Sequence, residues 1–173
     1  MTEELIKETH AILVKGINGD NAGFLSSKEY GGIHRSDEIF AGSLPFPKPS
    51  KIPEAMRSMI QNLDKDLGSA AKDKELDPFA LAAKYADRIV NIHPFIDGNG
   101  RMCRLVLNAI LIKYAGIVVN VGEHDQSRDE YILIARESTE VGGHSGALGT
   151  LVLKEATKSL KKMRDRLKGK KRE

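Results

Sequence analysis

The sequence predicts an all-α domain of about six to seven helices that carries one short β-hairpin. Apolar residues recur at helical spacing along most of the chain. Helix start and stop signals fit this pattern, since Thr2 and Asp77 are suitable N-caps and Gly116 is a suitable residue beyond a C-terminus. The expected helices cover residues 2–17, 51–67, 77–93, 105–112, 125–137 and 148–167. In the first expected helix, Leu5, Thr9, Ile12 and Leu13 stand at helical spacing.

Residues 32–42 differ from the helical segments. β-Branched or aromatic residues stand on both sides of an expected turn at 36–38, which predicts a short β-hairpin. Two strands alone are only marginally stable, but their free edge can pair with a strand from another chain. The proline-rich residues 44–53 are expected to be extended, and the charged residues 68–76 are expected to form a loop.

Composition is that of one globular domain. The chain has 173 residues, of which 40% are hydrophobic and 29% charged. We expect residues 1–143 to form the core and residues 144–173 to add a basic C-terminal helix packed on the same domain. The single Cys103 excludes an internal disulfide and suits a reducing compartment. No apolar signal segment follows the acidic N-terminus, so a cytoplasmic location is expected.

Charge is concentrated at the C-terminus. Residues 154–173 hold ten Lys or Arg and three Asp or Glu, a net charge of +7 in a chain of net charge +3. Such a tail can bind nucleic acid or an acidic membrane, but no aromatic residue is interleaved for base stacking. A solvated helix end is the favoured interpretation. No membrane partner is expected, nucleic acid is not favoured, and oligomerisation stays open.

One twelve-residue segment combines groups that suit phosphate chemistry. It reads His93-Pro-Phe-Ile-Asp97-Gly-Asn99-Gly-Arg101-Met-Cys-Arg104. Gly98 and Gly100 allow φ > 0 and close approach of backbone N–H groups to a ligand. They also stand at the N-terminus of the next predicted helix, where unpaired N–H groups and the helix dipole favour anions.

The charged residues of this segment have matching roles. Arg101 and Arg104 are three residues apart, so both forks of donors can face one polyphosphate. Asp97 is the type of oxygen ligand that Mg²⁺ takes when phosphates and water complete its coordination. His93 can accept a proton near neutral pH. A plain Asn-Gly hairpin turn is the alternative, but the flanking segments do not alternate as strands would.

This segment resembles the signature of the Fic family, H-P-F-x-(D/E)-G-N-G-R-x-x-R, and matches it at every fixed position. The resemblance implies a mostly helical fold that binds ATP with Mg²⁺ and transfers AMP to a hydroxyl of a target protein. It spans roughly residues 1–140, and outside the signature it includes Ala22-Gly23, Arg35, Asn108 and residues 129–131.

The resemblance also implies roles for single residues. His93 is expected to be the general base and Asp97 the Mg²⁺ ligand. Tyr131 falls where the family places a tyrosine beside the adenine, and Ser138 replaces an asparagine that helps several relatives bind the base. Ile39 and Phe40 are expected to dock the target, although they could instead only cover the core. The expected nucleotide-binding residues are Phe95, Gly98, Asn99, Gly100, Arg101, Arg104, Tyr131 and Ser138.

The expected reaction is attack of a Ser, Thr or Tyr hydroxyl, deprotonated by His93, on the α-phosphorus of ATP. Three other outcomes of the family's chemistry stay open: transfer of phosphocholine, transfer of the γ-phosphate, and removal of AMP. A nucleotide-dependent binding module without catalysis is also open, but such a module would not need His93.

Many Fic proteins carry an inhibitory helix with the pattern (S/T)-x-x-x-E-(G/N). Here only Ser50 has a glutamate four residues on, and this Glu54 is followed by Ala55 in a proline-rich connection. The resemblance therefore implies one of three situations: a separate inhibitory protein, an inhibitory segment outside this sequence, or an unrestrained enzyme.

Overall fold

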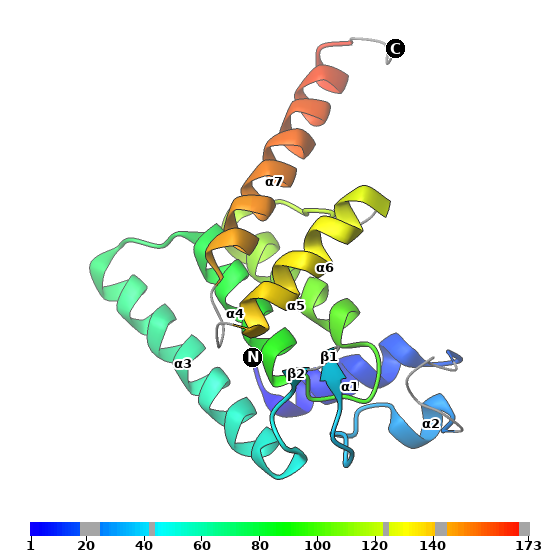
Figure 1. Ribbon diagram of the computed structural model, residues 1–173. Coiled ribbons are helices and arrows are strands. Elements are labelled where there is room, and N and C mark those ends of the chain that lie inside the picture. Colours follow the sequence, from blue (N-terminus) through cyan, green and yellow to red (C-terminus); the bar gives the residue numbers. More distant parts are fainter. Residues whose placement is uncertain (18–24, 42–43, 123–124, 141–144, 170–173) are drawn as a thin grey trace.

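The computed structural model describes residues 1–17, 25–41, 44–122, 125–140 and 145–169. The described residues form seven α-helices, which confirms the predicted all-α fold (Figure 1). The α-helices are α1 (Glu3–Val14), α2 (Ser27–Tyr30), α3 (Ile52–Asp73), α4 (Pro78–Ile92), α5 (Asn99–Ala115), α6 (Asp125–Glu140) and α7 (Gly146–Leu167). A 3₁₀ helix, η1 (Pro49–Lys51), precedes α3, and two short strands are β1 (Phe40–Ala41) and β2 (Leu44–Pro45).

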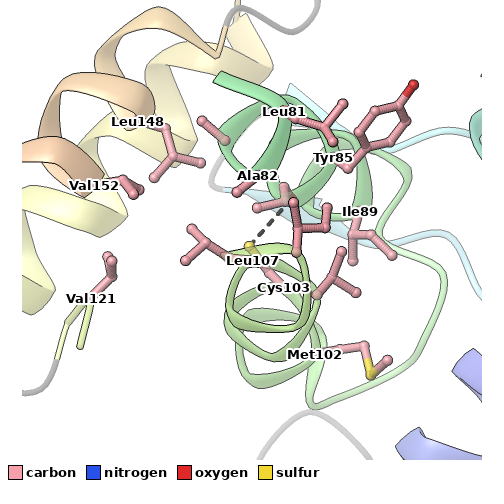
Figure 2. Close-up of a cluster of buried hydrophobic side chains, with 14 of the residues drawn as sticks. Leu81, Ala82, Tyr85, Ile89, Met102, Cys103, Leu107, Val121, Leu148 and Val152 are labelled. Atoms are coloured by element: carbon pink, nitrogen blue, oxygen red, sulfur yellow. Dashed lines mark hydrogen bonds between the residues drawn. The ribbon is translucent and has the colours of Figure 1, made fainter. Parts of the chain in front are cut away.

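Helices α4 and α5 form the centre of the molecule, with the other helices packed around them (Figure 1). Figure 2 shows Ala82 and Ile89 of α4 facing Cys103 and Leu107 of α5. Small residues at this interface let the two helix axes approach closely, so that even the Cys103 thiol donates to the Ala86 carbonyl at 3.3 Å. This close packing fixes the position of the loop that connects α4 to α5.

Both central helices end as their sequences predict. The Asp77 carboxylate caps α4 by accepting from the Phe79 and Ala80 amides at 2.9 and 3.0 Å, and Pro78 occupies the first turn. Helix α5 ends at Gly116, whose φ of +66° is the left-handed conformation that glycine adopts readily.

Two helices differ from the sequence-based expectation. Helix α1 buries Ile6, His10 and Val14, whereas Leu5 and Ile12 face solvent. Leu13 is partly buried and packs against the core, but the expected set missed the fully buried positions because a histidine stands among them. Helix α3 does not stop before residue 68 but runs to Asp73, since one Gly68 costs only about 1 kcal/mol in a helix interior and good helix formers follow it.

The hairpin predicted over residues 32–42 is wrong in its position. Antiparallel pairing instead joins β1 to β2, with Phe40 opposite Pro45, and the Phe46 amide extends it by donating to the Ile39 carbonyl. The residues before β1 bond to another part of the chain, because the Arg35 amide donates to the Pro94 carbonyl at 2.9 Å. Arg35 therefore holds this segment against the loop that follows α4 and leaves it no hairpin partner.

Helix α7 packs on the core through its first half only. Leu148, Leu151, Val152 and Ala156 belong to the same buried cluster as α4 and α5. The second half extends away from the other helices, toward the C-terminal end of the chain in Figure 1. There the residues with exposed side chains include Leu160, Met163 and Leu167.

Among the residues that the structure describes, no helix combines the length and the apolar character needed to cross a membrane. Ala22-Gly23, part of the expected family resemblance, lies outside the described residues.

Candidate active site

His93 occupies the turn between α4 and the loop before α5. Its backbone adopts a left-handed conformation (φ +49°), which is unusual for a residue with a Cβ and turns the chain sharply at the helix end. The ring atom Nδ1 lies 3.2 Å from the Val90 carbonyl oxygen. Since a carbonyl only accepts, Nδ1 carries the proton, and Nε2 keeps a lone pair.

The environment of His93 favours the neutral imidazole. The Phe46 ring packs against it with a centroid distance of 3.9 Å. The pKa of His93 is lowered to about 4, chiefly by burial and also by the positive charge of Arg35, against the opposing effects of the Val90 carbonyl and Asp97. The ring is therefore uncharged at neutral pH and its Nε2 is unprotonated, as a general base requires.

The loop between His93 and α5 is braced from within. The Phe95 amide donates to Asn99 Oδ1 at 3.0 Å, and Asn99 Nδ2 donates to the Phe95 carbonyl at 2.7 Å. These two bonds occupy the amide group of a side chain that is almost fully buried. Asn99 thus shapes the loop through its side chain.

Helix α5 begins directly at this loop. Gly98 is its N-cap, with a φ of +79°, and Asn99 is its first helical residue. The N-terminal N–H groups and the positive end of the dipole of this 17-residue helix therefore point toward the loop side of the molecule. This is the arrangement that binds phosphate groups in many proteins.

The charged residues lie around the start of α5, with Asp97 in the loop before it and Arg101 and Arg104 on its first turns. Asp97 Oδ2 and Arg101 Nη2 form an ion pair at 2.9 Å, and both side chains are partly exposed. The Arg104 guanidinium carbon lies 6.0 Å from the centre of the Tyr131 ring of α6, which holds it over an aromatic face. The two arginines thus border one space between α5 and α6.

That space is a cavity of about 550 Å³, large enough for a nucleotide. Of the predicted site residues, the structure brings together His93, Asp97, Gly98, Asn99, Gly100, Arg101, Arg104 and Tyr131. A second cavity of about 400 Å³ adjoins it and shares Arg101, Arg104 and Gly122. Imidazole, carboxylate, guanidinium groups and a helix N-terminus therefore converge on one pocket.

Four predicted residues lie outside this lining. The Phe95 ring is fully buried and stacks on His10. Ser138 donates its hydroxyl to Asp87 at 2.5 Å, in the interface of α6 with α4. Ile39 and Phe40 lie on the β1 side, where Phe40 is 57% exposed and Ile39 is half-buried.

Tyr131 lines the cavity with its ring but not with its hydroxyl. The phenol donates to Cys103 Sγ at 3.0 Å in the core. A base could therefore contact the ring, but a hydrogen bond to the phenol would require breaking the one to Cys103. Burial raises the pKa of the Cys103 thiol to about 12, which leaves it protonated and excludes it as a nucleophile at neutral pH.

The cavity also contains residues that sequence reasoning missed. Gly122, Arg128 and Ile132 line it together with the signature residues. Arg128 adds a third guanidinium from the start of α6, and its position three residues before Tyr131 was the available signal. His10 and Phe46 were also missed. His10 contacts the loop through Asp97 and Phe95, and Phe46 packs against His93. Apolar periodicity did not indicate either contact.

The described residues hold no cluster of three or more His, Cys, Asp or Glu side chains that could bind a metal ion alone. Asp97 is the carboxylate in the cavity lining. One carboxylate with phosphate oxygens and water is a usual coordination for Mg²⁺, so the donor set fits a cation that arrives with a nucleotide.

Comparison with known proteins agrees with the geometry. The family model described as "Fic/DOC family" matches residues 1–111 of this chain. The chain belongs to the Fic/DOC family.

Among the relatives of this Fic/DOC chain is a Fido domain-containing protein of Dictyostelium discoideum, 36% identical over 83 residues, which are 48% of this chain and 55% of the relative. Another is the protein adenylyltransferase Fic of Nematostella vectensis, 37% identical over 83 residues, which are 47% of this chain and 18% of the relative. The chain thus matches about half of the first relative's length and a much smaller part of the second's.

The fold has solved counterparts. A Fic domain containing signaling protein from Bacteroides thetaiotaomicron superposes with a TM-score of 0.73 at 23% identity, over 100% of this chain and 66% of that one. This similarity is evidence for the fold.

Proposed function

We propose that this chain is a protein adenylyltransferase, which transfers AMP from ATP to a Ser, Thr or Tyr hydroxyl of a target protein. The observation that carries the proposal is the unprotonated Nε2 of His93 at the edge of a cavity lined by two signature arginines and the N-terminus of α5. The base and the anion site belong to one pocket, as phosphoryl transfer requires.

In the proposed reaction, the backbone N–H groups at Gly98–Gly100 and the Arg101 side chain bind the α- and β-phosphates, and Arg104 binds the γ-phosphate. Asp97 would hold Mg²⁺, which supplies charge neutralisation at the polyphosphate when it is bound. In the structure Asp97 pairs with Arg101 through Oδ2.

His93 then accepts the proton of the target hydroxyl at Nε2. The hydroxyl oxygen forms a bond to the α-phosphorus, the bond from that phosphorus to the β-bridging oxygen breaks, and pyrophosphate leaves. Positioning and charge neutralisation provide most of the rate enhancement in such reactions, and the base contributes typically ~10²–10⁴-fold.

The target is proposed to dock at the short strand pair. Phe40 of this pair is exposed, and Phe46, the residue directly after β2, packs against His93. A target segment that adds a strand here would bring its hydroxyl to the side of His93.

The test uses ATP labelled with ³²P at either the α or the γ position, incubated with the purified chain and a protein extract in Mg²⁺. The proposal predicts protein-bound label from the α position only, lost with EDTA and reduced by ~10²–10⁴-fold in His93→Ala. His93→Ala should bind ATP with an affinity close to that of the wild type.

Other labelling results contradict the proposal in distinct ways. Label from the γ position only indicates a kinase. No label from either position with intact ATP binding indicates a non-catalytic nucleotide-binding module or an enzyme that uses another donor. If His93→Ala still transfers AMP at the wild-type rate, His93 is not the general base.

A further inference from the structure

His10 is a buried histidine whose two ring nitrogens both bond to backbone groups. It lies in α1 with none of its surface exposed. Nδ1 lies 2.9 Å from the Gly32 amide nitrogen, and Nε2 lies 2.9 Å from the Asp97 carbonyl oxygen. An amide only donates and a carbonyl only accepts, so Nδ1 is the acceptor and Nε2–H is the donor. The surroundings of the ring fix its tautomer.

The ring also fits closely against the loop. His10 stacks on Phe95 with a centroid distance of 3.6 Å and an interplanar angle of 4°. A Cβ placed on Gly98 would lie 3.0 Å from His10 Nε2 and 3.1 Å from a methyl group of Val14. Gly98 therefore lacks a side chain for two reasons: its left-handed φ, and the presence of α1 directly beneath it.

The bond from His10 orients one particular peptide unit. In a trans peptide the carbonyl and the N–H point in opposite directions. Because the Asp97 carbonyl points at His10, the N–H of Gly98 in the same unit points away from α1. Gly98 lines the cavity beside Gly100 and Arg101, so this orientation is the one in which its N–H can meet an anion.

We propose that His10 is a positioning residue, which holds the Asp97–Gly98 peptide unit so that the Gly98 N–H faces the phosphates of the bound nucleotide. The proposal rests on the nucleotide site of the proposed function. Through Nδ1 the same ring ties Gly32, and with it the segment that leads to Arg35 and β1, to the catalytic loop. One side chain from the first helix thus connects the anion site with the strand pair.

The competing interpretation is that His10 only fills the core. Three substitutions separate the two, because each keeps a different part of the ring's contacts. His10→Phe keeps the stack on Phe95 and loses both hydrogen bonds. His10→Gln places an amide donor near the position of Nε2, toward Asp97. His10→Asn places an acceptor near the position of Nδ1, toward Gly32, and offers Asp97 no donor.

The experiment measures the Kd of Mg-ATP by calorimetry and the thermal midpoint of each purified variant. We expect His10→Phe to weaken Mg-ATP binding about tenfold, the loss of roughly one hydrogen bond to a charged group. His10→Gln should recover most of that affinity, whereas His10→Asn should not, even where the thermal midpoints of the two are similar. Ile6→Ala is the matched control, a core truncation in the same helix that should lower the midpoint and leave the Kd unchanged.

A readout without ligand makes the test independent of catalysis. The ¹⁵N–¹H resonance of the Gly98 amide should shift in His10→Asn and His10→Phe and return toward its wild-type position in His10→Gln. An unmoved Gly98 amide in His10→Asn, or affinities that follow the thermal midpoints of all variants including Ile6→Ala, overturns the positioning role. If the wild type binds Mg-ATP but transfers no AMP, the proposed function fails while the rescue pattern still decides the role of His10.

Discussion

His93 is placed so that burial, rather than a charged partner, sets its protonation. Its Nδ1–H donates to Val90 and the Phe46 ring covers one face, so Nε2 is the nitrogen that the proposed function assigns to the target hydroxyl. A base with a very low pKa is a weak one in the free protein. Bound polyphosphate adds negative charge near the ring, which raises the pKa of an imidazole toward the working pH.

The first prediction concerns this titration. In the free chain the pKa of His93 is lowered to about 4, so its ring stays neutral from pH 8 down to about pH 5 and gains a proton only below that. Mg-ATP should move the midpoint upward. Following the Cε1–H resonance of His93 with and without Mg-ATP measures both values. A midpoint at the ordinary value near 6.5 in the free chain would contradict the buried geometry.

The second prediction concerns Phe46, which sequence reasoning did not single out. Phe46→Ala uncovers the imidazole, so the pKa of His93 should rise toward its ordinary value and the ring should become free to rotate. Transfer should fall by ~10-fold or more, because the base is no longer aligned. The Kd of Mg-ATP should stay within about twofold, since Phe46 does not line the cavity.

Phe46→Leu is the companion variant, which restores part of the apolar cover and should recover part of the activity. Unchanged transfer and an unchanged His93 titration in Phe46→Ala would show that the Phe46 ring affects neither the pKa nor the alignment of His93.

At the scale of elements, Arg35 joins the segment before β1 to the end of α4. Its guanidinium donates to the carbonyls of His93, Asp37 and Pro47 at 2.7, 2.7 and 2.6 Å, and the side chain is nearly fully buried. Three separate backbone segments therefore share one cation. The family resemblance included Arg35, but nothing in the sequence indicated that its side chain binds the backbone carbonyl of His93.

The third prediction follows from these three hydrogen bonds of the Arg35 guanidinium group. Arg35→Lys should lower the free energy of unfolding by about 2–4 kcal/mol, because an ammonium group cannot reach three carbonyls in different directions and leaves buried acceptors unpaired. Arg57→Lys, at an exposed position of α3, should change it by less than about 0.5 kcal/mol. Urea denaturation of both variants measures the two free energies of unfolding. Equal decreases in the two variants would show that the three hydrogen bonds of Arg35 do not stabilise the fold.

The fourth prediction concerns the contact of α4 with α5. Ala82 is fully buried there, so Ala82→Leu overpacks the interface and should cost about 1–3 kcal/mol of unfolding free energy. Ala80→Leu, on the exposed side of the same helix, should be nearly neutral. Denaturant unfolding of the two variants measures both free energies. An unchanged free energy of unfolding in Ala82→Leu would mean that α4 and α5 are not closely packed.

At the scale of the whole molecule, much of the fold follows from local signals in the chain. Thr2, Asp77 and Gly116 mark helix ends because their side chains, or the lack of one, satisfy backbone groups locally. The signature loop is also readable, because its roles lie within twelve consecutive residues. These features need no knowledge of distant partners.

What the sequence could not supply depends on contacts far apart in the chain. His10 and Asp97 are 87 positions apart, and Ser138 and Asp87 are 51 apart. The first contact places His10, which apolar periodicity did not single out, against the signature loop. The second holds Ser138 in the interface of α6 with α4, away from the cavity. The strand pair was misplaced for the same reason, since a bond from Arg35 to Pro94 overrides a local turn.

Placing the nucleotide directly tests the central claim, that the loop before α5 holds a polyphosphate beside His93. A crystal structure of the wild-type chain with Mn²⁺ and an ATP analogue that resists cleavage between the α- and β-phosphorus would do so. We expect the β-phosphate against the N–H groups of Gly98–Gly100, the anomalous signal of Mn²⁺ at Asp97, and the α-phosphorus on the side of His93 Nε2. An analogue bound outside this cavity, or bound in reverse with its γ-phosphorus nearest His93, would contradict the account.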